Sequence, residues 1–196
     1  YYCNYFVMDI KVIDNFLSKS YHEKLFKILT SADFPWYFIN NITQNDSSDL
    51  REFGFNHTFW DTDNGQRENF HSWFWKPALY QMMDVIECDL ILRSRCDMTT
   101  HTDGNFLHCP HIDFDFPHFS TIFYINDCDG DTVFYDKRTM NTDEIQFLEL
   151  NEIKRVTPKA NRLIIFDGDI IHTGSSPSKN KKRILINSNF LKKGDS

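Results

Sequence analysis

Histidine and aspartate side chains gather between residues 101 and 118, where the chain reads HTDGNFLHCPHIDFDFPH. This window holds four of the eight histidines of the sequence: His101, His108, His111 and His118. Two of them begin a His-x-Asp pair, one with Asp103 and one with Asp113. Because residues i and i+2 of an extended chain point to the same face, each pair could offer an imidazole nitrogen and a carboxylate oxygen to one metal ion.

The third ligand of such a metal site must come from elsewhere, and His172 is the only histidine after residue 118. Two histidines and one carboxylate on one face leave three open positions on an octahedral metal, as in the non-haem Fe(II) oxygenases. We favour His111 and Asp113 because they stand just before STIFYIN, a predicted core strand, and we expect His172 at a loop end. His101 and Asp103, beside an Asp-Gly-Asn turn, are the alternative, and His108 and His118 are expected to be wall or surface residues.

Arg183 lies eleven residues beyond His172, at the start of the predicted last strand. An oxidative metal site of this kind needs an electron source, and a 2-oxo acid can chelate iron through its keto and carboxylate oxygens. Its far carboxylate then needs a buried cation, and arginine pairs both oxygens of a carboxylate while staying charged. The alternative is that Arg183 is an exposed edge-strand residue and that Lys181 or Lys182 binds the carboxylate.

Length and composition restrict the class of protein. A chain of 196 residues with 41% apolar residues and 19 phenylalanines is long enough for one domain with a full core. The net charge of −7 argues against nucleic acid as a partner. Five cysteines without a C-x-x-C motif are typical of reduced thiols in a cytoplasmic protein. No apolar run reaches the length of a membrane span, and the first residues do not look like a secretory signal.

The spacing of apolar residues predicts helices first and short strands afterwards. An opening strand in YFVMDIKVID precedes a helix capped by Ser20 and Glu23, and a second helix begins near Pro77. From residue 88 the period changes from 3.6 to 2, which indicates about seven or eight short strands up to residue 190. The strand segments are DLILRSRCDM, STIFYIN, DTVFYD, RVTPKANRLIIFDGD (two strands) and RILINSNF. We therefore predict an α+β, mainly β chain whose β part is a sandwich or barrel.

Three segments together resemble the 2-oxoglutarate/Fe(II)-dependent dioxygenases: HIDFDFPHFSTIFYINDCDGDTVFYD, IIFDGDIIHTGSSP and KKRILIN. The likeness is greatest to the prolyl-4-hydroxylase-like branch, including its small phage and marine microbial forms. It implies a double-stranded β-helix, or jelly roll, with N-terminal supporting helices. On this resemblance residues 1–196 form a single domain, with N-terminal elements to about residue 87 and the jelly roll from 88 to 190. It also implies a microbe- or phage-encoded cytoplasmic enzyme.

The resemblance implies roles for five residues. His111, Asp113 and His172 would bind Fe(II), while Arg183 and Tyr124, the latter in the motif YIN, would bind the distal carboxylate of 2-oxoglutarate. The alternative for Tyr124 is a plain core residue. The implied reaction uses O2, with ascorbate as an optional reductant, and hydroxylates a C–H bond with release of succinate and CO2. The substrate could be a peptidyl proline, which the family likeness favours, another protein side chain, a free amino acid or a small metabolite. No nucleic acid or membrane partner is expected.

Two other classes of protein fit parts of the pattern. A metal-binding, cupin-like jelly roll without oxygenase activity would keep the three ligands but lack a buried arginine. A structural domain with incidental histidines would bind no metal stoichiometrically. Arg183 and a metal titration therefore discriminate among the three.

Overall fold

The computed structural model describes residues 10–43, 48–62, 69–104 and 106–192. These residues form ten β-strands, two α-helices and two short 3-10 helices. The N-terminal elements are β1 (Lys11–Asp14), α1 (Lys19–Leu29), β2 (Tyr37–Ile39), β3 (Gly54–Asp61), η1 (Ser72–Phe74) and α2 (Lys76–Ile86). The remaining elements are β4 (Ile91–Thr100), β5 (His118–Tyr124), β6 (Thr132–Arg138), η2 (Thr142–Phe147), β7 (Glu152–Val156), β8 (Arg162–Asp167), β9 (Ile170–Gly174) and β10 (Lys182–Leu191).

The strands form two sheets that face each other. The larger has seven strands in the order β1-β8-β5-β10-β4-β3-β2, and the smaller has the order β7-β6-β9. All these pairings are antiparallel. Two antiparallel sheets packed in this way make the jelly roll that the sequence predicts, and β1, β2 and β3 extend its larger sheet at both edges.

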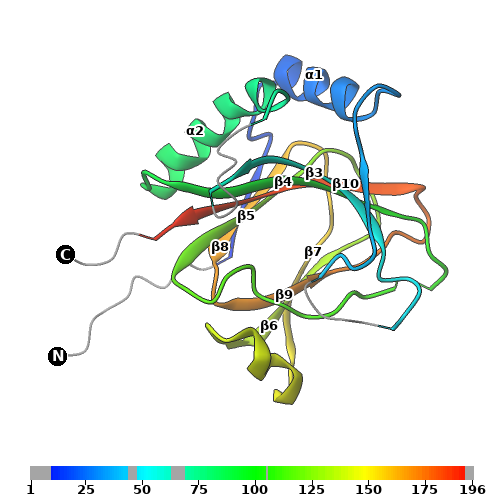
Figure 1. Cartoon of the computed structure of the whole chain (residues 1–196), viewed down its shortest axis with the longest axis vertical. Coiled ribbons are helices and arrows are strands. Elements are labelled where there is room, and N and C mark those ends of the chain that lie inside the picture. The colour runs from blue at the N-terminus through cyan, green and yellow to red at the C-terminus, as the bar shows by residue number, and fades with distance from the viewer. Residues whose placement is uncertain (1–9, 44–47, 63–68, 105, 193–196) are drawn as a thin grey trace.

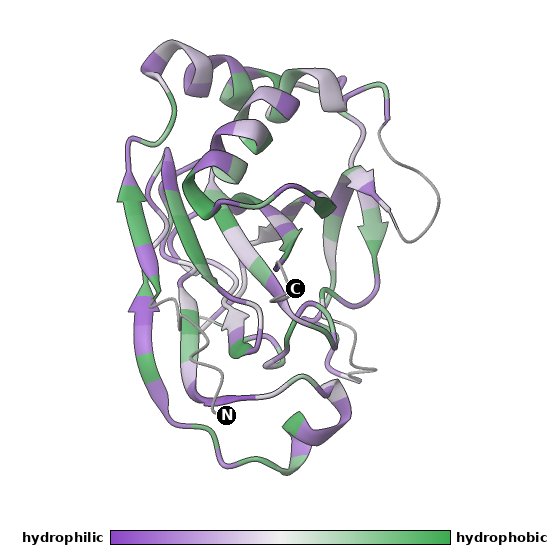
Figure 2. Ribbon diagram, turned by 90° about the vertical axis from the view of Figure 1, so that its left-hand side faces the viewer, coloured by the Kyte–Doolittle hydropathy of each residue, from purple (hydrophilic) through white to green (hydrophobic). Residues whose placement is uncertain are grey.

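The two α-helices cover the outer face of the larger sheet, opposite the smaller sheet (Figure 1). Both helices are amphipathic, and they bury Leu25, Leu29, Leu79 and Met82 against the sheet. A second apolar cluster lies between the two sheets and includes Ile122, Phe134 and Phe166. Hydropathy varies along the strands (Figure 2). Strands β5, β8 and β10 are buried on both faces, because the helices cover one face of the larger sheet and the smaller sheet covers the other.

Register between β4 and β10 aligns polar residues on the face of the larger sheet that is turned toward the smaller one. Thr99 pairs with Arg183, Asp97 with Leu185, Arg95 with Asn187 and Arg93 with Asn189. Because side chains alternate between faces, every second residue of both strands shares this inner face. These two strands therefore supply most of the charged wall of the cavity described below.

Several predictions about elements are confirmed and some are wrong. The strands around STIFYIN, DTVFYD and RILINSNF, and the helix near Pro77, are present. The proposed capping box is wrong: α1 starts at Lys19 after Ser18, with no side-chain capping bond. We did not predict β2, β3 or β9, and part of the opening strand lies outside the described residues. None of the helices in the described part of the chain is long and apolar enough to cross a membrane.

Candidate metal centre and its cavity

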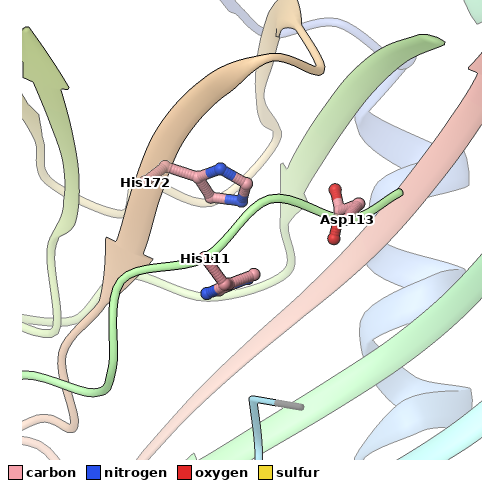
Figure 3. Close-up of side chains that lie close together, drawn as sticks. All are labelled: His111, Asp113 and His172. Atoms are coloured by element: carbon pink, nitrogen blue, oxygen red, sulfur yellow. The ribbon is translucent and has the colours of Figure 1, made fainter. Parts of the chain in front are cut away.

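His111, Asp113 and His172 come together at one end of the space between the sheets. Their ligand atoms, one from each side chain, all lie within 4.8 Å of one another. Figure 3 shows His111 and Asp113 on the segment before β5 and His172 on β9, with the three side chains converging. It is the only such group of three or more His, Cys, Asp or Glu side chains that the described residues contain. One metal ion could contact all three.

Backbone pairing brings the two histidines opposite each other. The His111 N–H donates to the His172 carbonyl at 2.9 Å, and the His172 N–H donates back at 3.0 Å. A second bridge joins Leu107 to Ser175, so residues 107–111 run antiparallel along the free edge of β9. Directly opposed residues place their side chains on the same face of the pair, and the two rings are 4.6 Å apart between centroids.

Each imidazole is held so that its other nitrogen is available to a metal. His111 Nδ1 lies 3.1 Å from the Cys109 carbonyl, and His172 Nδ1 lies 3.1 Å from the Ile170 carbonyl. A carbonyl only accepts, so Nδ1 carries the hydrogen in both rings and Nε2 presents its lone pair. This arrangement, with the outer ring nitrogen donating to a backbone carbonyl, is the usual one for metal-binding histidines.

The Asp113 carboxylate is fixed by four donors. Its Oδ2 accepts hydrogen bonds from Ser120 Oγ at 2.7 Å, Asn189 Nδ2 at 2.8 Å and Asn187 Nδ2 at 3.3 Å. Its Oδ1 accepts one from Arg93 at 3.2 Å. Hydrogen bonds to a metal-binding carboxylate set its orientation and are part of the metal site. We did not predict these donors, although the period of two along RILINSNF places Asn187 and Asn189 on the same face as Arg183.

The electrostatics of the site favour the protonation states that bind a cation. Burial lowers the pKa of His172 to about 4, and neighbouring His111 acts in the same direction. Burial also lowers the pKa of His111. For Asp113, burial alone would raise the pKa, but interactions with His172, Arg93 and His111 hold it well below the ordinary value. Near pH 7 both rings are therefore neutral and the carboxylate is ionised.

The lowered pKa of His172 predicts that the metal-free chain loses stability in mild acid. Between the ordinary pKa of 6.5 and about 4, the unfolded chain binds a proton that the folded chain excludes, so unfolding is favoured as pH falls. We expect His172 to account for about 2 kcal/mol between pH 7 and pH 5. Chemical denaturation of chelator-treated protein at both pH values measures this loss. His172→Asn should show a smaller loss and His101→Asn the same loss as the parent chain; identical losses in all three chains would contradict the assignment.

The three candidate ligands line a cavity, and Arg183 lines the same cavity. Arg183 is 6% exposed and donates to Thr132 Oγ1 at 2.7 Å. Tyr124 OH lies 2.5 Å from the same Thr132 oxygen, and its ring is 5.6 Å from the guanidinium carbon. Thr132 therefore stands between the two residues that the resemblance assigns to 2-oxoglutarate. Thr132 lines the cavity, whereas Tyr124 does not and is fully buried.

Arg183 has the features of an anion-binding residue. Its Nε is buried without a hydrogen bond, and no carboxylate of the described residues pairs with it. Its position depends on glycine: a Cβ at Gly174 would lie 2.9 Å from the Arg183 guanidinium, and one at Gly130 would lie 2.9 Å from its Cδ. A buried cation without an acidic partner is costly unless a bound anion compensates it, which fits the distal carboxylate of a 2-oxo acid.

The other candidate histidines lie elsewhere. His101 and Asp103 are exposed and 3.6 Å apart, and neither belongs to the group of three ligands. His108 lines the cavity but both its ring nitrogens are taken, by Glu52 at 2.9 Å and by Ser176 at 2.9 Å. His118 is buried against Gly168. The structure thus brings His111 and Asp113, and not the alternative pair, to His172.

Comparison with known proteins places the fold. No family model and no curated protein sequence matches the chain. Solved structures do match, and several of them are 2-oxoglutarate/Fe(II) oxygenases, so this chain has the fold of those proteins. One is a 2OG-Fe(II) oxygenase family protein from Burkholderia pseudomallei, with a TM-score of 0.64, 11% identity, and coverage of 94% of this chain and 86% of that one.

Two further solved structures that match this chain are enzymes that catalyse different reactions. A prolyl hydroxylase from Trichoplax adhaerens, solved with a hypoxia-inducible factor peptide, has a TM-score of 0.63, 16% identity, and coverage of 93% of this chain and 83% of that one. The epimerase SnoN from nogalamycin biosynthesis, which is alpha-ketoglutarate dependent, has a TM-score of 0.63, 11% identity, and coverage of 93% and 77%. The shared feature is therefore the fold, and neither the reaction nor the substrate follows from it.

Proposed function

We propose that this chain is a 2-oxoglutarate- and O2-dependent Fe(II) dioxygenase that hydroxylates a C–H bond. The observation that carries the proposal is one cavity with the His111, Asp113 and His172 cluster on its wall and a buried, unpaired Arg183 beside it. The ligand set is the two-histidine, one-carboxylate set of such iron sites. SnoN has also been solved with Fe3+ and alpha ketoglutarate, which supports the same pair of cofactors here.

The protonation states and free hydrogen-bonding atoms of the site residues fit Fe(II) and 2-oxoglutarate. Both histidine Nε2 atoms are free of other partners in the described residues, and Asp113 is held ionised by Arg93 and its other neighbours. Arg183 Nε is an unused donor in a buried position. Three protein ligands leave room for a chelating 2-oxo acid and O2. A cupin-like protein without a co-substrate would have no use for a buried arginine in this position.

Bound Fe(II) and 2-oxoglutarate would supply the activation of O2, and the chain supplies position and electrostatics. His111, Asp113 and His172 would hold the metal on one face. Arg183, with Thr132 and Tyr124 behind it, would hold the distal carboxylate so that the keto acid reaches the metal. In the balanced reaction one atom of O2 enters the substrate as hydroxyl and the other enters succinate, with release of CO2.

The substrate class is the finer part of the proposal. The resemblance to prolyl 4-hydroxylases suggests a peptidyl proline, and the Trichoplax adhaerens prolyl hydroxylase was solved with a peptide. That argument depends on likeness alone. The charged wall of the cavity bears more directly on the chemistry of the substrate.

Anaerobic titration with Fe(II) tests the cofactors. We expect a weak visible charge-transfer band that forms only when Fe(II) and 2-oxoglutarate are both present, because a keto-acid chelate at such an iron absorbs visible light. Succinate formation under air, followed by NMR, tests turnover. Tight metal binding without the band would contradict the proposal and favour the cupin-like class.

A further inference from the structure

Four charged side chains line the cavity: Arg95, Asp97, Asp113 and Arg183. The proposed function uses two of them, Asp113 for the metal and Arg183 for the co-substrate. Arg95 and Asp97 are left, and they carry opposite charges on neighbouring positions of the same strand face. Charged groups in a cavity wall are costly to desolvate, so a pair without a role in metal or co-substrate binding calls for a ligand of its own.

The ion pair between Arg95 and Asp97 uses only part of each group. Arg95 Nε lies 2.7 Å from Asp97 Oδ1 and pairs with it. No other hydrogen bond joins either side chain to the described residues, whereas Arg93 on the same strand donates to Asp113. Burial raises the pKa of Asp97 even though Arg95 and Arg93 oppose this shift. The carboxylate is therefore incompletely compensated by the two arginines.

Strand register places Arg95 on the metal side of the cavity and Asp97 between Arg95 and the level of Arg183. Arg95 pairs with Asn187, whose amide donates to the Asp113 carboxylate. Arg183 lies four residues away along β10, which corresponds to roughly 13 Å. A ligand held by Arg95 would thus lie beside the metal and apart from the Arg183 guanidinium.

Two polar atoms without partners lie near the pair: one on Asn187, opposite Arg95, and one on Thr99, which follows Asp97 on the same face of β4 and lies opposite Arg183. Asn187 Oδ1 and Thr99 Oγ1 are buried, line the same cavity and have no hydrogen bond within the described part of the chain. Unsatisfied buried polar atoms are uncommon, and several around one cavity indicate that a polar molecule completes them. The pyrrolidine ring of a proline would by itself satisfy none of these atoms.

We propose that Arg95 and Asp97 bind the substrate, and that the substrate is a free amino acid whose carboxylate contacts Arg95 and whose ammonium group contacts Asp97. The inference rests on the proposed function for its reaction, hydroxylation of a C–H bond of that amino acid. A residue inside a peptide lacks both charges. The two charges of a free amino acid are close together and of opposite sign, as are the two side chains.

Equilibrium binding and turnover test the proposal separately. Calorimetry measures binding of each of the twenty proteinogenic L-amino acids to the chain with Mn(II) and 2-oxoglutarate. Under air with Fe(II), the same compounds are screened for stimulated succinate formation and for gain of one oxygen atom by mass. We expect at least one free amino acid to bind and react. Its N-acetyl and carboxamide derivatives should bind at least about tenfold more weakly, since each removes one charge.

Two variants assign the charges. Arg95→Met and Asp97→Asn should each weaken binding of that amino acid on the order of 100-fold, because each leaves a ligand charge unpaired in the cavity. Both should keep the parent affinity for 2-oxoglutarate within about twofold. Arg155→Met, which removes an arginine paired with Asp131 and Glu152 at the surface, is the matched control and should bind the amino acid normally.

Three results would overturn the inference. The first is the charge-transfer band without binding of any free amino acid. The second is a blocked amino acid or a proline-containing peptide that binds as well as the free compound. The third is an Arg95→Met variant that binds 2-oxoglutarate and the amino acid with equally reduced affinity, which would assign Arg95 to co-substrate binding. If the protein binds a free amino acid but shows no charge-transfer band with Fe(II) and 2-oxoglutarate, the amino-acid site is supported and the proposed function is contradicted.

Discussion

Replacement of Arg183 by Met should weaken 2-oxoglutarate binding about 100- to 1,000-fold while leaving the affinity for Fe(II) or Mn(II) almost unchanged. Arg183 is 6% exposed and donates a hydrogen bond to Thr132, and no acidic side chain of the described residues pairs with it. A distal carboxylate bound there would lose its only cation. Leaving a buried charge unpaired costs about 3–5 kcal/mol, which sets the size of the effect.

The measurement is the 2-oxoglutarate concentration that gives half of the charge-transfer band, or half of the calorimetric heat with Mn(II). Arg183→Lys should fall between the parent chain and Arg183→Met, since an ammonium group keeps the charge but not the two parallel hydrogen bonds. Lys182→Met, next to it on β10 and half-buried, is the matched control and should bind 2-oxoglutarate normally. A normal affinity in Arg183→Met, with loss of affinity in Lys182→Met, would move the anchor to the lysine.

Gly174→Ala offers a second test that removes no functional group. Its Cβ would lie 2.9 Å from one terminal nitrogen of Arg183 and 3.2 Å from the other. Contacts this short force the guanidinium to move, so 2-oxoglutarate affinity should fall in this variant too. Gly104→Ala meets no atom within 4 Å and, despite the positive φ of 80° at Gly104, should leave the cavity unchanged.

The sequence predicts most of the jelly roll because its strands carry a clear period of two. DLILRSRCDM and RILINSNF correspond to β4 and β10, which form the centre of the larger sheet. β9 was harder to predict because IIHTG is short and follows β8 after only two residues. The capping box failed because helix ends depend on local backbone geometry, and here Ser18 precedes the helix without a side-chain bond.

The site residues that belong to short sequence motifs could also be predicted from the sequence. His111 and Asp113 are two residues apart, and His172, the only histidine after residue 118, was the expected third ligand. Thr132 and Ser120 could not be found in this way, because a hydroxyl residue on a strand has no distinguishing spacing. Their roles depend on which strands become neighbours across the sandwich. Arg95 and Asp97 likewise become significant only when the register places them beside Asn187, next to the metal ligand Asp113.

The burial of His172 in the core determines which substitution can test its role as a ligand. We expected it at a loop end, but it lies within β9, is 3% exposed, and its ring packs 4.8 Å from Phe166 and 6.2 Å from Phe134 between centroids. An alanine there would leave a cavity in the core as well as remove a ligand. Glutamine keeps more of the volume and polarity, so it separates the loss of metal from the loss of packing.

His172→Gln should therefore lower the affinity for Fe(II) and Mn(II) by more than about 100-fold, because removal of outer-shell partners alone costs 10- to 100-fold. Mn(II) titration followed by EPR measures the free ion directly. His101→Gln is the matched control, since His101 is exposed and belongs to the rejected His-x-Asp pair.

Asn189→Ala should give an intermediate loss of about 10-fold, because Asn189 donates to Asp113 Oδ2 at 2.8 Å without being a ligand. This order of effects follows from distance to the metal: ligand, then hydrogen-bond donor to a ligand, then remote histidine. Metal loss in His101→Gln with full retention in His172→Gln would reverse the assignment of the pair. Equal losses in His172→Gln and Asn189→Ala, with folding intact in both, would indicate that the carboxylate of Asp113 carries most of the binding and that His172 contributes mainly to packing against Phe166.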